Sequence, residues 1–358
     1  MAAKQQNRLR IFLKDKNKKS FLRMFRESMY LWISKREIPF YYFKYLYRKN
    51  VVNYKDYIST KEAHKIQFSN AFHKPEHLSI ISNKLSFSIF CEQINLPVPK
   101  LISHNLNSNF IFKGELFKVA SKEDLQSFFK NIFNNTNHEN IFVKPLSLYG
   151  GIGCYRINKN NLEADINKCV DFVIHNSCVH EEVVLQHPEI NKIHADCINT
   201  IRMETFIDKQ GKTHLLSAFM RFGVGESFVD NAHSGGFYVG IDLENGTLNE
   251  IGNQYMEYGG ATLTAHPDNN FVFGGFKIPL FKEAIELTMK SVDYIPDRYI
   301  GWDIAISKEG PVIIEANEYP AIFMSDIAYG GYLKHPLYKG ILEEVRSSSI
   351  SEHHKPIF

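Results

Sequence analysis

The stretch Ile300–Pro320, IGWDIAISKEGPVIIEANEYP, consists of two apolar runs on either side of a short polar turn. Apolar runs of this length around a glycine-containing turn are typical of a β-hairpin. The runs nevertheless carry two carboxylates and an amide, which belong to Asp303, Glu315 and Asn317. Burying a polar group without a partner costs several kcal/mol, so we expect these side chains to share a partner.

The side-chain period of a strand brings these polar groups together. Glu315 and Asn317 are two residues apart, so on a strand they lie on the same face. If Ser307–Pro311 form the loop, Asp303 lies opposite Glu315, whereas a shift of one residue would turn Asp303 to the other face. In the first register three oxygen ligands converge, and such ligands suit Mg²⁺. The alternative is an exposed hairpin edge, although the surrounding isoleucines favour burial.

A second motif, KPLSLYGGIG at residues 144–153, combines a lysine with a glycine-rich loop. Lys144 lies at the end of a predicted strand, and Gly150, Gly151 and Gly153 follow it. Glycines allow successive backbone N–H groups to turn toward an anion, and the lysine adds a positive charge for the same phosphates. The alternative is an ordinary hairpin turn. The motif does not match the P-loop pattern, and the chain contains no HRD or DFG motif of protein kinases.

Composition excludes several other classes of protein. The 358 residues are 44% hydrophobic, which is enough for a large core and for more than one domain or subdomain. No run reaches the ~18 apolar residues of a transmembrane helix, and the N-terminus lacks the apolar core of a signal peptide. The five cysteines form no CxxC pair, so we expect reduced thiols in a cytoplasmic protein.

Charge is distributed unevenly along the chain. Residues 1–50 contain 14 Lys or Arg and three acidic residues, a net charge of +11, which leaves −8 on the rest because the whole chain carries +3. The segment also contains Trp32 and the aromatic run FYYFKYLY, Phe40–Tyr47. Basic and aromatic residues together favour an anionic membrane surface, with the aromatic side chains as interfacial anchors. The alternative is a cationic helical cap whose aromatic residues pack on the rest of the protein.

The remaining pattern combines helices with antiparallel strands. Residues 1–75 show apolar residues at helical spacing, and residues 279–293 form a further amphipathic helix. Strand pairs with glycine-containing turns are predicted within residues 140–157 and 199–225. Hairpins interleaved with single helices predict an α+β fold with antiparallel sheets.

The order of these motifs resembles that of the ATP-grasp superfamily, and most closely that of its sugar-transfer-associated family. The shared features are a lysine at a helix start, the lysine with its glycine loop, a glutamate-containing hinge strand and the D…E-x-N hairpin, together with LQHPEI, INTIRMET and VDNAHSGG. They cover about residues 76–345. The resemblance implies an ATP-grasp fold in which two α+β subdomains clasp ATP. We therefore expect a basic helical N-terminal region at 1–75, the N-terminal subdomains with the glycine loop at 76–190, the C-terminal subdomain with the metal site at 191–345, and a tail at 346–358.

The resemblance also implies roles for individual residues. ATP would be bound by Lys84, Lys144, Gly150, Gly151, Gly153, Glu181, Glu182 and Val184. Which of the two neighbouring glutamates meets the adenine amino group stays open. Mg²⁺ would lie between the β- and γ-phosphates on Asp303, Glu315 and Asn317. The transferring phosphoryl group would be neutralised by Arg202 and Arg221, for which a surface ion pair between strands is the alternative. The polar block VDNAHSGG, which could also be a plain turn, offers as substrate ligands Asp230, Asn231, His233 and Gly235.

Superfamily chemistry, as implied by the resemblance, is the activation of a carboxylate. The carboxylate attacks the γ-phosphate of ATP, and an amine then attacks the acyl-phosphate to give an amide, ADP and phosphate. We expect an ADP-forming carboxylate–amine ligase that uses ATP and Mg²⁺ to attach an amino acid or amine to an acidic sugar or related carboxylate of a surface polysaccharide. The alternatives are an amino-acid or peptide ligase that makes a small metabolite, and a non-catalytic ATP-binding partner of a glycosyltransferase. We expect small-molecule or glycan substrates, a cytoplasmic location with peripheral contact to an anionic membrane at its inner face, and no nucleic-acid partner.

Overall fold

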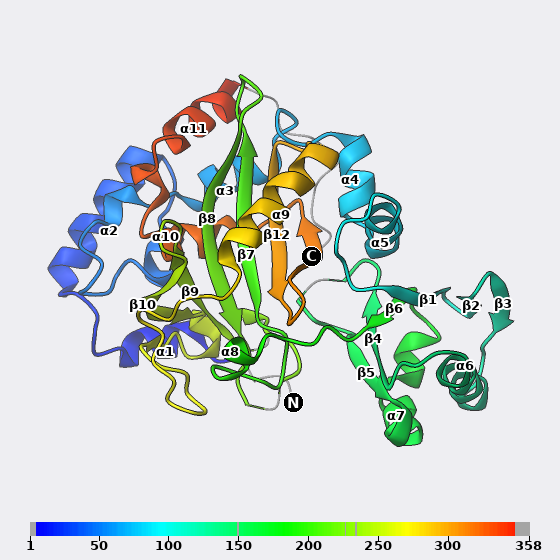
Figure 1. Ribbon diagram of the computed structural model, residues 1–358. Coiled ribbons are helices and arrows are strands. Elements are labelled where there is room, and N and C mark those ends of the chain that lie inside the picture. The colour runs from blue at the N-terminus through cyan, green and yellow to red at the C-terminus, as the bar shows by residue number, and fades with distance from the viewer. Residues whose placement is uncertain (1–4, 149, 226, 233–234, 348–358) are drawn as a thin grey trace.

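The computed structural model describes residues 5–148, 150–225, 227–232 and 235–347. These residues form two antiparallel sheets, of six and seven strands, with helices packed on both (Figure 1). The combination of helices with antiparallel sheets is the α+β class that the sequence predicts.

The first sheet has the strand order β3-β2-β1-β6-β4-β5. Its strands are β1 (Leu101–Leu106), β2 (Asn109–Phe112), β3 (Glu115–Lys118), β4 (Asn140–Pro145), β5 (Tyr155–Asn158) and β6 (Cys178–Glu182). The apolar sides of helices α6 (Lys122–Asn135) and α7 (Leu162–Val173) pack on this sheet, where Phe129, Ile141 and Ile166 belong to one buried cluster. The predicted strand pair around the glycine loop is present as β4 and β5.

The second sheet has the strand order β11-β10-β9-β8-β7-β12-β13. Its strands are β7 (Thr200–Ile207), β8 (Thr213–Phe222), β9 (Phe237–Asp242), β10 (Thr247–Gln254), β11 (Thr262–Leu263), β12 (Tyr299–Ile306) and β13 (Pro311–Asn317). Helix α9 (Phe281–Tyr294) covers one face, where Met203, Leu287 and Trp302 share a buried cluster. Because side chains alternate along a strand, the neighbouring Arg202 and Asp303 point to the opposite face.

The stretch Ile300–Pro320 contains the hairpin β12–β13, in the register that places Asp303 opposite Glu315. The loop is one residue shorter than expected, since Pro311 is already paired. A bulge at Ile314, an extra residue on β13, compensates for the shorter loop and restores the predicted pairing of Asp303 with Glu315. The predicted register is therefore confirmed, whereas the loop length on which it was based is wrong.

Helices and single 3-10 turns make up most of the N-terminal region. They are α1 (Arg8–Lys14), α2 (Phe21–Lys35), η1 (Phe40–Lys44), η2 (Tyr54–Asp56) and α3 (Thr60–Gln67), and the helices α4 (Pro75–Ile81) and α5 (Lys84–Gln93) follow this region. Tyr42 and Tyr47 are fully buried and share a cluster with Tyr238 and Ile327 of the second sheet and its helix α10 (Ile322–Tyr329). Residues up to η2 therefore form a cap on that face of the sheet, as in the alternative interpretation of the basic segment.

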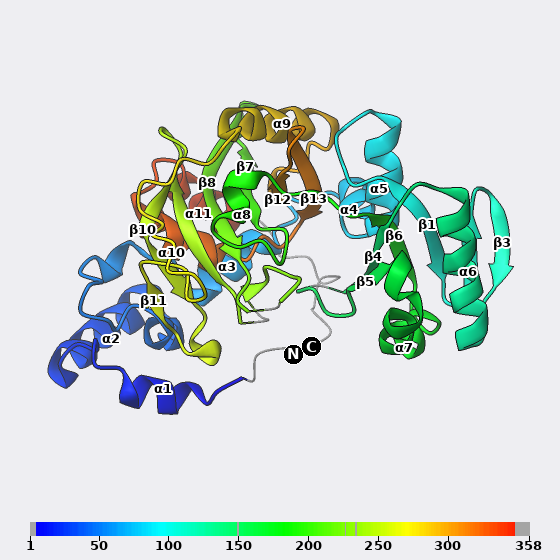
Figure 2. The ribbon, with the colours of Figure 1, turned by 60° about the horizontal axis from the view of Figure 1, so that its bottom comes forward.

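Short elements complete the chain. They are η3 (Lys159–Asn161), α8 (Pro188–Asn191), η5 (Met256–Tyr258), η6 (Tyr332–Lys334) and α11 (Tyr338–Ser347). Helix α11 includes the first two residues of the predicted tail 346–358, and the others lie outside the described residues. The first sheet and the helices α1 and α2 lie on opposite sides of the second sheet (Figure 2). Among the described residues, we find no helix with the length and hydropathy needed to span a bilayer.

Candidate active site

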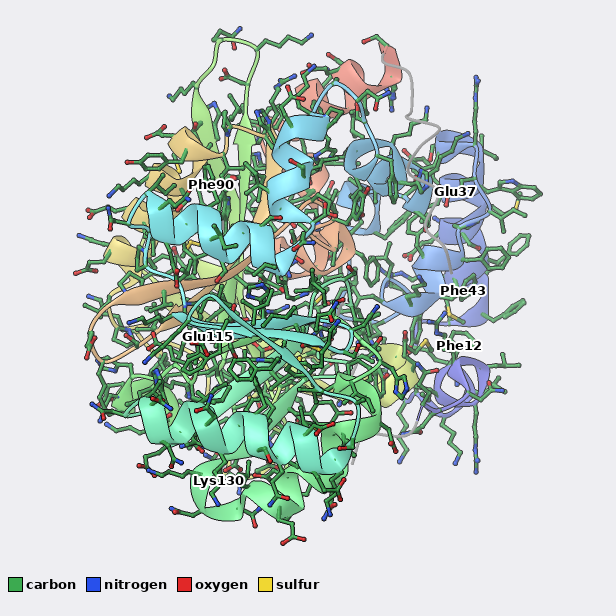
Figure 3. All side chains as sticks on the ribbon, turned by 90° about the vertical axis from the view of Figure 1, so that its right-hand side faces the viewer. Phe12, Glu37, Phe43, Phe90, Glu115 and Lys130 are labelled. Carbon is green, nitrogen blue, oxygen red and sulfur yellow. The ribbon has the colours of Figure 1, made fainter. Side chains whose placement is uncertain are left out.

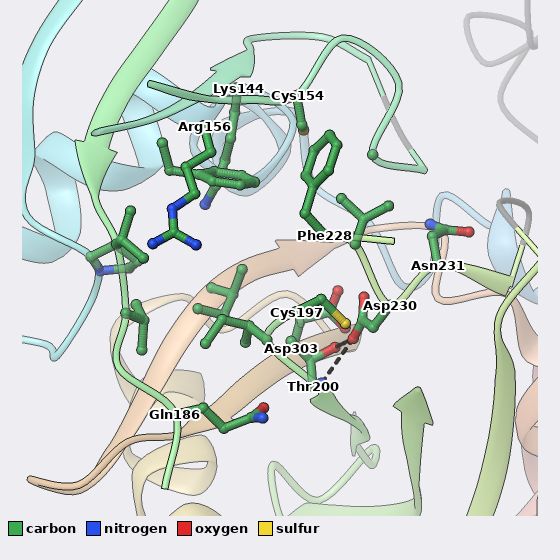
Figure 4. A pocket seen from close by; sticks show the side chains of 18 of the residues that line it. Lys144, Cys154, Arg156, Gln186, Cys197, Thr200, Phe228, Asp230, Asn231 and Asp303 are labelled. Carbon is green, nitrogen blue, oxygen red and sulfur yellow. Dashed lines mark hydrogen bonds between the residues drawn. The ribbon is translucent and has the colours of Figure 1, made fainter. Parts of the chain in front are cut away.

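A cavity of about 410 Å³ lies between the two sheets (Figure 4). Lys144 of β4 lines it from the first sheet, and Arg221 of β8 and Asp303 of β12 line it from the second. The wall also includes Glu182, the last residue of β6, and residues 183–186, which follow it on the way to the second sheet. A cleft of this size between two subdomains is a typical place for a small-molecule or nucleotide ligand.

Asp303 is fully buried and lies between two arginines. Arg202 donates from Nε and Nη2 to its two carboxylate oxygens, the second bond at 3.2 Å, and Arg221 donates from Nη2 to Oδ2 at 2.6 Å. Burial disfavours the charged carboxylate, but the two guanidinium groups outweigh it and hold the pKa of Asp303 well below its usual range. Asp303 is therefore a charged carboxylate whose position is fixed by β7 and β8.

The two arginines differ in what they can reach. Arg202 also donates from Nη1 to the carbonyl oxygen of Pro320 at 2.8 Å, and it is absent from the described cavity lining. Arg221 lines the cavity, and its Nε and Nη2 donate to the hydroxyl oxygen of Thr200 at 3.0 and 2.5 Å. Of the two predicted catalytic arginines, only Arg221 is thus in a position to contact a ligand in the cavity, and Arg202 acts on Asp303 instead.

Glu315 and Asn317 complete the predicted metal-binding group. Glu315 faces Asp303 across the hairpin, and Asn317 Nδ2 donates to Glu315 Oε1 at 3.3 Å. Burial and the neighbouring charge of Asp303 raise the pKa of Glu315. Asn317 is absent from the described lining of this cavity and lines a smaller pocket beside Glu315. Two mutually repelling carboxylates with an amide side chain next to them form a group that a divalent cation would stabilise. These residues therefore fit Mg²⁺, with Glu315 as the more open ligand, since Asp303 already accepts three hydrogen bonds from the arginines.

The predicted phosphate-binding lysines come from β4 of the first sheet and from the start of α5. Lys144 Nζ lies 2.7 Å from Glu181 Oε2. Burial works against the Lys144 ammonium group, but Glu181 outweighs it and raises the pKa of Lys144. Lys84, the first residue of α5, lies 3.9 Å from Glu315 Oε2 through its Nζ, which also donates to the carbonyl oxygen of Leu148 at 2.9 Å. Both lysines line the cavity, so both can reach an anion bound there.

The glycine loop contributes to the cavity through two of its three glycines. Gly150 and Gly151 line it with φ angles of 76° and 73°, in the left-handed region that glycine tolerates. A Cβ atom on Gly151 would lie 3.0 Å from Val229, so this loop closes tightly on the segment after β8. Gly153 has other surroundings, because a Cβ atom there would lie only 2.2 Å from the Phe172 ring of α7. The prediction that Gly153 covers the phosphates is therefore not supported, and this glycine serves the packing of the loop on α7.

The structure separates the two glutamates that the sequence leaves open for adenine. Glu181 is buried beside Lys144, whereas Glu182 lines the cavity and accepts from the backbone N–H of Lys100 at 3.1 Å. Val184 lines the same wall two residues later. The structure therefore brings Glu182 and Val184, and not Glu181, to the wall where the resemblance implies an adenine ring.

Asp230, a predicted substrate ligand, makes structural contacts at the cavity wall. Its Oδ2 accepts from the backbone N–H and the hydroxyl group of Thr200 at 2.8 and 2.5 Å (Figure 4). Burial raises the pKa of Asp230, although Arg221 opposes this shift. Because Thr200 also accepts from Arg221, Asp230 and Thr200 together orient that guanidinium group. Thr200 is absent from our sequence-based predictions, although its spacing of two from Arg202 places both on one strand face.

The other predicted substrate ligands have different positions. Asn231 lines the cavity beside Gly150, on which a Cβ atom would lie 3.5 Å from the Asn231 amide. The carbonyl oxygen of Gly235 accepts from Gln254 Nε2 at 2.8 Å, and Gly235 is absent from the described lining. His233 lies outside the described residues. Of the four predicted substrate ligands, Asp230 and Asn231 are thus the described residues at the cavity.

Gln186 is a further cavity residue that we did not predict. Its Oε1 accepts from the backbone N–H and the side-chain Nδ2 of Asn199 at 2.7 and 3.0 Å, and its Nε2 donates to the carbonyl oxygen of His194 at 2.9 Å. These bonds hold the segment after β6 against the start of β7. The polar residue inside LQHPEI was the available signal, but its partners lie too far along the sequence to be recognised.

Comparison with known proteins gives a family match over most of the chain. A family model described as sugar-transfer associated ATP-grasp matches residues 63–339. The match begins before the predicted start at residue 76 and ends before residue 345. No curated protein matches the chain.

Several solved structures are similar to the chain at low sequence identity. D-alanyl-alanine synthetase A from Vibrio cholerae is 13% identical, with 76% of this chain and 66% of that chain covered and a TM-score of 0.45. D-alanine–D-alanine ligase from Bacillus anthracis, complexed with ATP, is 13% identical, with 77% and 68% covered and a TM-score of 0.40. The ATP-grasp ligase PsnB, complexed with a minimal precursor, is 13% identical, with 78% and 64% covered and a TM-score of 0.40. The chain thus spans about two thirds of the length of these proteins. Since the family model matches well over half of its residues, the chain belongs to the sugar-transfer-associated ATP-grasp family and has an α+β ATP-grasp fold.

Proposed function

We propose that the protein is an ADP-forming carboxylate–amine ligase that joins an amino acid or other amine to an acidic sugar or related carboxylate of a surface polysaccharide. The observation that carries this proposal is the cavity in which Lys144 of the first sheet meets Arg221, Asp303 and Glu315 of the second. The family description supports sugar transfer as the context, and ATP as co-substrate supports a cytoplasmic location.

In the proposed reaction, residues of both sheets hold the phosphates of ATP. Lys144 supplies positive charge from the first sheet and Lys84 from the start of α5, and the backbone N–H groups of Gly150 and Gly151 supply donors. Glu315 and Asn317 would hold Mg²⁺ together with Asp303. The bound cation would neutralise negative charge on the β- and γ-phosphates.

The chemistry then takes two steps. A carboxylate oxygen of the substrate attacks the γ-phosphorus, and the bond from that phosphorus to the ADP oxygen breaks. The amine nitrogen next attacks the carbonyl carbon, phosphate leaves, and the nitrogen loses a proton to give the amide. Arg221, fixed by Thr200 and Asp303, stabilises charge on the transferring group, because a rigid donor needs little reorganisation.

Water must be excluded because it hydrolyses an acyl-phosphate. The contact between the glycine loop and residues 229–231 supports this role, since Gly151 lies against Val229 and Gly150 beside Asn231. Closure of this contact over the bound nucleotide would shield the reacting carbonyl.

The test is ADP release with candidate sugar acids and amino acids, with hydroxylamine as a trap for the acyl-phosphate. We expect a hydroxamate and ADP with the matching acid. Glu315→Gln should raise the Mg²⁺ concentration needed for half-maximal release by about tenfold or more. Glu309→Gln, an exposed change in the same hairpin, serves as the control and should leave it unchanged. Release of AMP, or a stable phosphorylated product, would contradict the proposal.

A further inference from the structure

Helix α2 has two apolar sides, and the described residues cover one of them. Met24 and Leu31 are buried under the cap. On the other side Phe21, Leu22 and Ile33 are 81%, 70% and 72% exposed. Leu22 and Ile33 are three helical turns apart, so the exposed residues follow the helix as one continuous stripe. A helix on the surface of a soluble protein normally has polar residues on its exposed side.

The exposed stripe continues beyond α2. We call it, with its neighbours, the outer cap face, which comprises the exposed apolar residues Leu9, Leu13, Phe21, Leu22, Phe25, Trp32, Ile33, Ile38, Phe40 and Phe43. Phe12 and Phe43 lie next to each other at this side of the molecule, with their ring centroids 5.7 Å apart (Figure 3). An apolar surface that extends over α1, α2 and η1 indicates a binding surface.

Helices α1 and α2, which carry much of the outer cap face, also carry exposed basic residues that have no ion-pair partner in the part of the chain that the structure describes. The acidic residues Asp15 and Glu27 are already bound within the cap, by Arg48 and by Lys19 and Arg23. In contrast, no acidic side chain of the described chain lies within ion-pair distance of four exposed basic residues, which are Arg10, Lys14, Arg26 and Arg36. Their charge is therefore available to an external anion.

We propose that the outer cap face docks on an anionic lipid bilayer. A helix with an exposed apolar stripe and basic residues beside it lies in the membrane interface, where lipid covers the stripe and the cations meet acidic headgroups. A second copy of the chain fits less well, since two caps of the same positive sign repel each other. Nucleic acid also fits less well, because exposed aliphatic residues such as Leu22 and Ile33 cannot contact its phosphates.

The buried aromatic residues determine how the cap, and with it the outer cap face, is oriented relative to the two sheets. Tyr41, Tyr42 and Tyr47 fix the cap to the second sheet, so the predicted anchoring role of the run Phe40–Tyr47 is wrong for these side chains. Because the first sheet lies on the far side of the second sheet from α1 and α2, docking would keep the first sheet away from the bilayer (Figure 2). The proposal is independent of the proposed chemistry, since no described residue of α1 or α2 lines the large cavity.

The test is sedimentation of the full-length protein with vesicles of phosphatidylcholine alone or mixed with phosphatidylserine, at low and high salt. We expect binding to the mixed vesicles that high salt releases, and little binding to phosphatidylcholine alone. Leu22→Ser/Ile33→Ser should weaken this binding about tenfold or more, as should Arg10→Glu/Arg26→Glu. All four positions are exposed, so the variants should keep the wild-type unfolding temperature.

Matched controls change exposed residues elsewhere on the surface. Leu116→Ser/Val272→Ser and Lys130→Glu/Lys282→Glu should bind like the wild type. Absence of binding at low salt, equal binding to both vesicle types, or equal effects of control and cap variants would each overturn the proposal. So would a concentration-dependent dimer that Leu22→Ser/Ile33→Ser dissociates, because the stripe would then be covered by a second copy.

Discussion

Asp303 connects the proposed metal-binding residues to the arginines of the second sheet. Its carboxylate accepts from Arg202 and Arg221, and it faces Glu315 across the hairpin. A single buried charge with two cationic partners is strongly fixed, whereas loss of one partner leaves part of that charge unpaired. The two arginines around this carboxylate therefore have different positions: Arg202 contacts Asp303 away from the cavity, and Arg221 contacts Asp303 and lines the cavity.

Conservative substitutions should separate the roles of the two arginines. Arg221→Lys should lower kcat for ADP release by roughly 100-fold or more with little change in KM for ATP, because a rigid donor to the transferring group is lost. Arg202→Lys should mainly lower the unfolding temperature, because it leaves Asp303 and the Pro320 carbonyl oxygen with fewer donors.

The matched control is Arg298→Lys, which weakens a two-bond contact with Glu344 away from the cavity. It should lower the unfolding temperature and leave kcat unchanged. Equal losses of kcat in the Arg202 and Arg221 variants would show that their positions relative to the cavity do not decide their roles.

Strand β6 contributes both to the core of the first sheet and to the wall of the cavity. Cys178 and His180 face the core, whereas Glu182 reaches the cavity at the end of the strand. His180 is fully buried, with its ring nitrogens 2.7 Å from Ser103 Oγ and 3.1 Å from Asn105 Oδ1. Burial lowers the pKa of His180 from an ordinary value of 6.5 to about 3.

This shift predicts a loss of stability in mild acid. Below pH 6.5 the unfolded chain binds a proton at His180 that the folded chain does not bind until about pH 3. The free energy of unfolding should therefore fall by about 1.4 kcal/mol for each pH unit in that window. The free energy of unfolding, measured with urea, should fall between about pH 7 and about pH 5. This fall should be about 2 kcal/mol smaller in His180→Gln than in the wild type.

The exposed His175 at the end of α7 provides the control. His175→Gln should keep the pH dependence of the wild type. An unchanged pH dependence in His180→Gln would contradict the assignment of this acid sensitivity to the first sheet.

The stability of the whole molecule depends on the cap, because side chains of the cap form part of the hydrophobic core. Tyr41, Tyr42 and Tyr47 are among the largest fully buried side chains, and they pack with Tyr238 and Ile327. A chain that starts after the cap would expose this apolar surface of the second sheet and α10 to water.

Deletion of residues 1–58 should therefore abolish a cooperative thermal transition and increase binding of an apolar dye. Deletion of residues 1–14 is the matched comparison, because α1 contains no buried residue. This shorter deletion should keep a cooperative transition within a few degrees of the wild type. A stable, dye-free protein after the longer deletion would show that the cap is dispensable for folding.

Local sequence determined the hairpin, the glycine loop and their order. The pairing of Asp303 with Glu315 follows from a side-chain period of two and a short loop, and the errors in loop length and bulge cancelled. The alternation of helical and strand patterns likewise determined the α+β class. These properties depend on residues that are close in the sequence, so they can be read without the fold.

Only the tertiary structure decided which of the similar side chains face the cavity. Arg202 and Arg221, or Glu181 and Glu182, are equivalent by residue type, and their positions depend on which strands become neighbours. The same holds for the N-terminal segment, where composition indicates aromatic residues but packing on α10 decides which are buried. Contacts between residues far apart in the sequence fix these choices, because burial is a property of the assembled layers and not of a single segment.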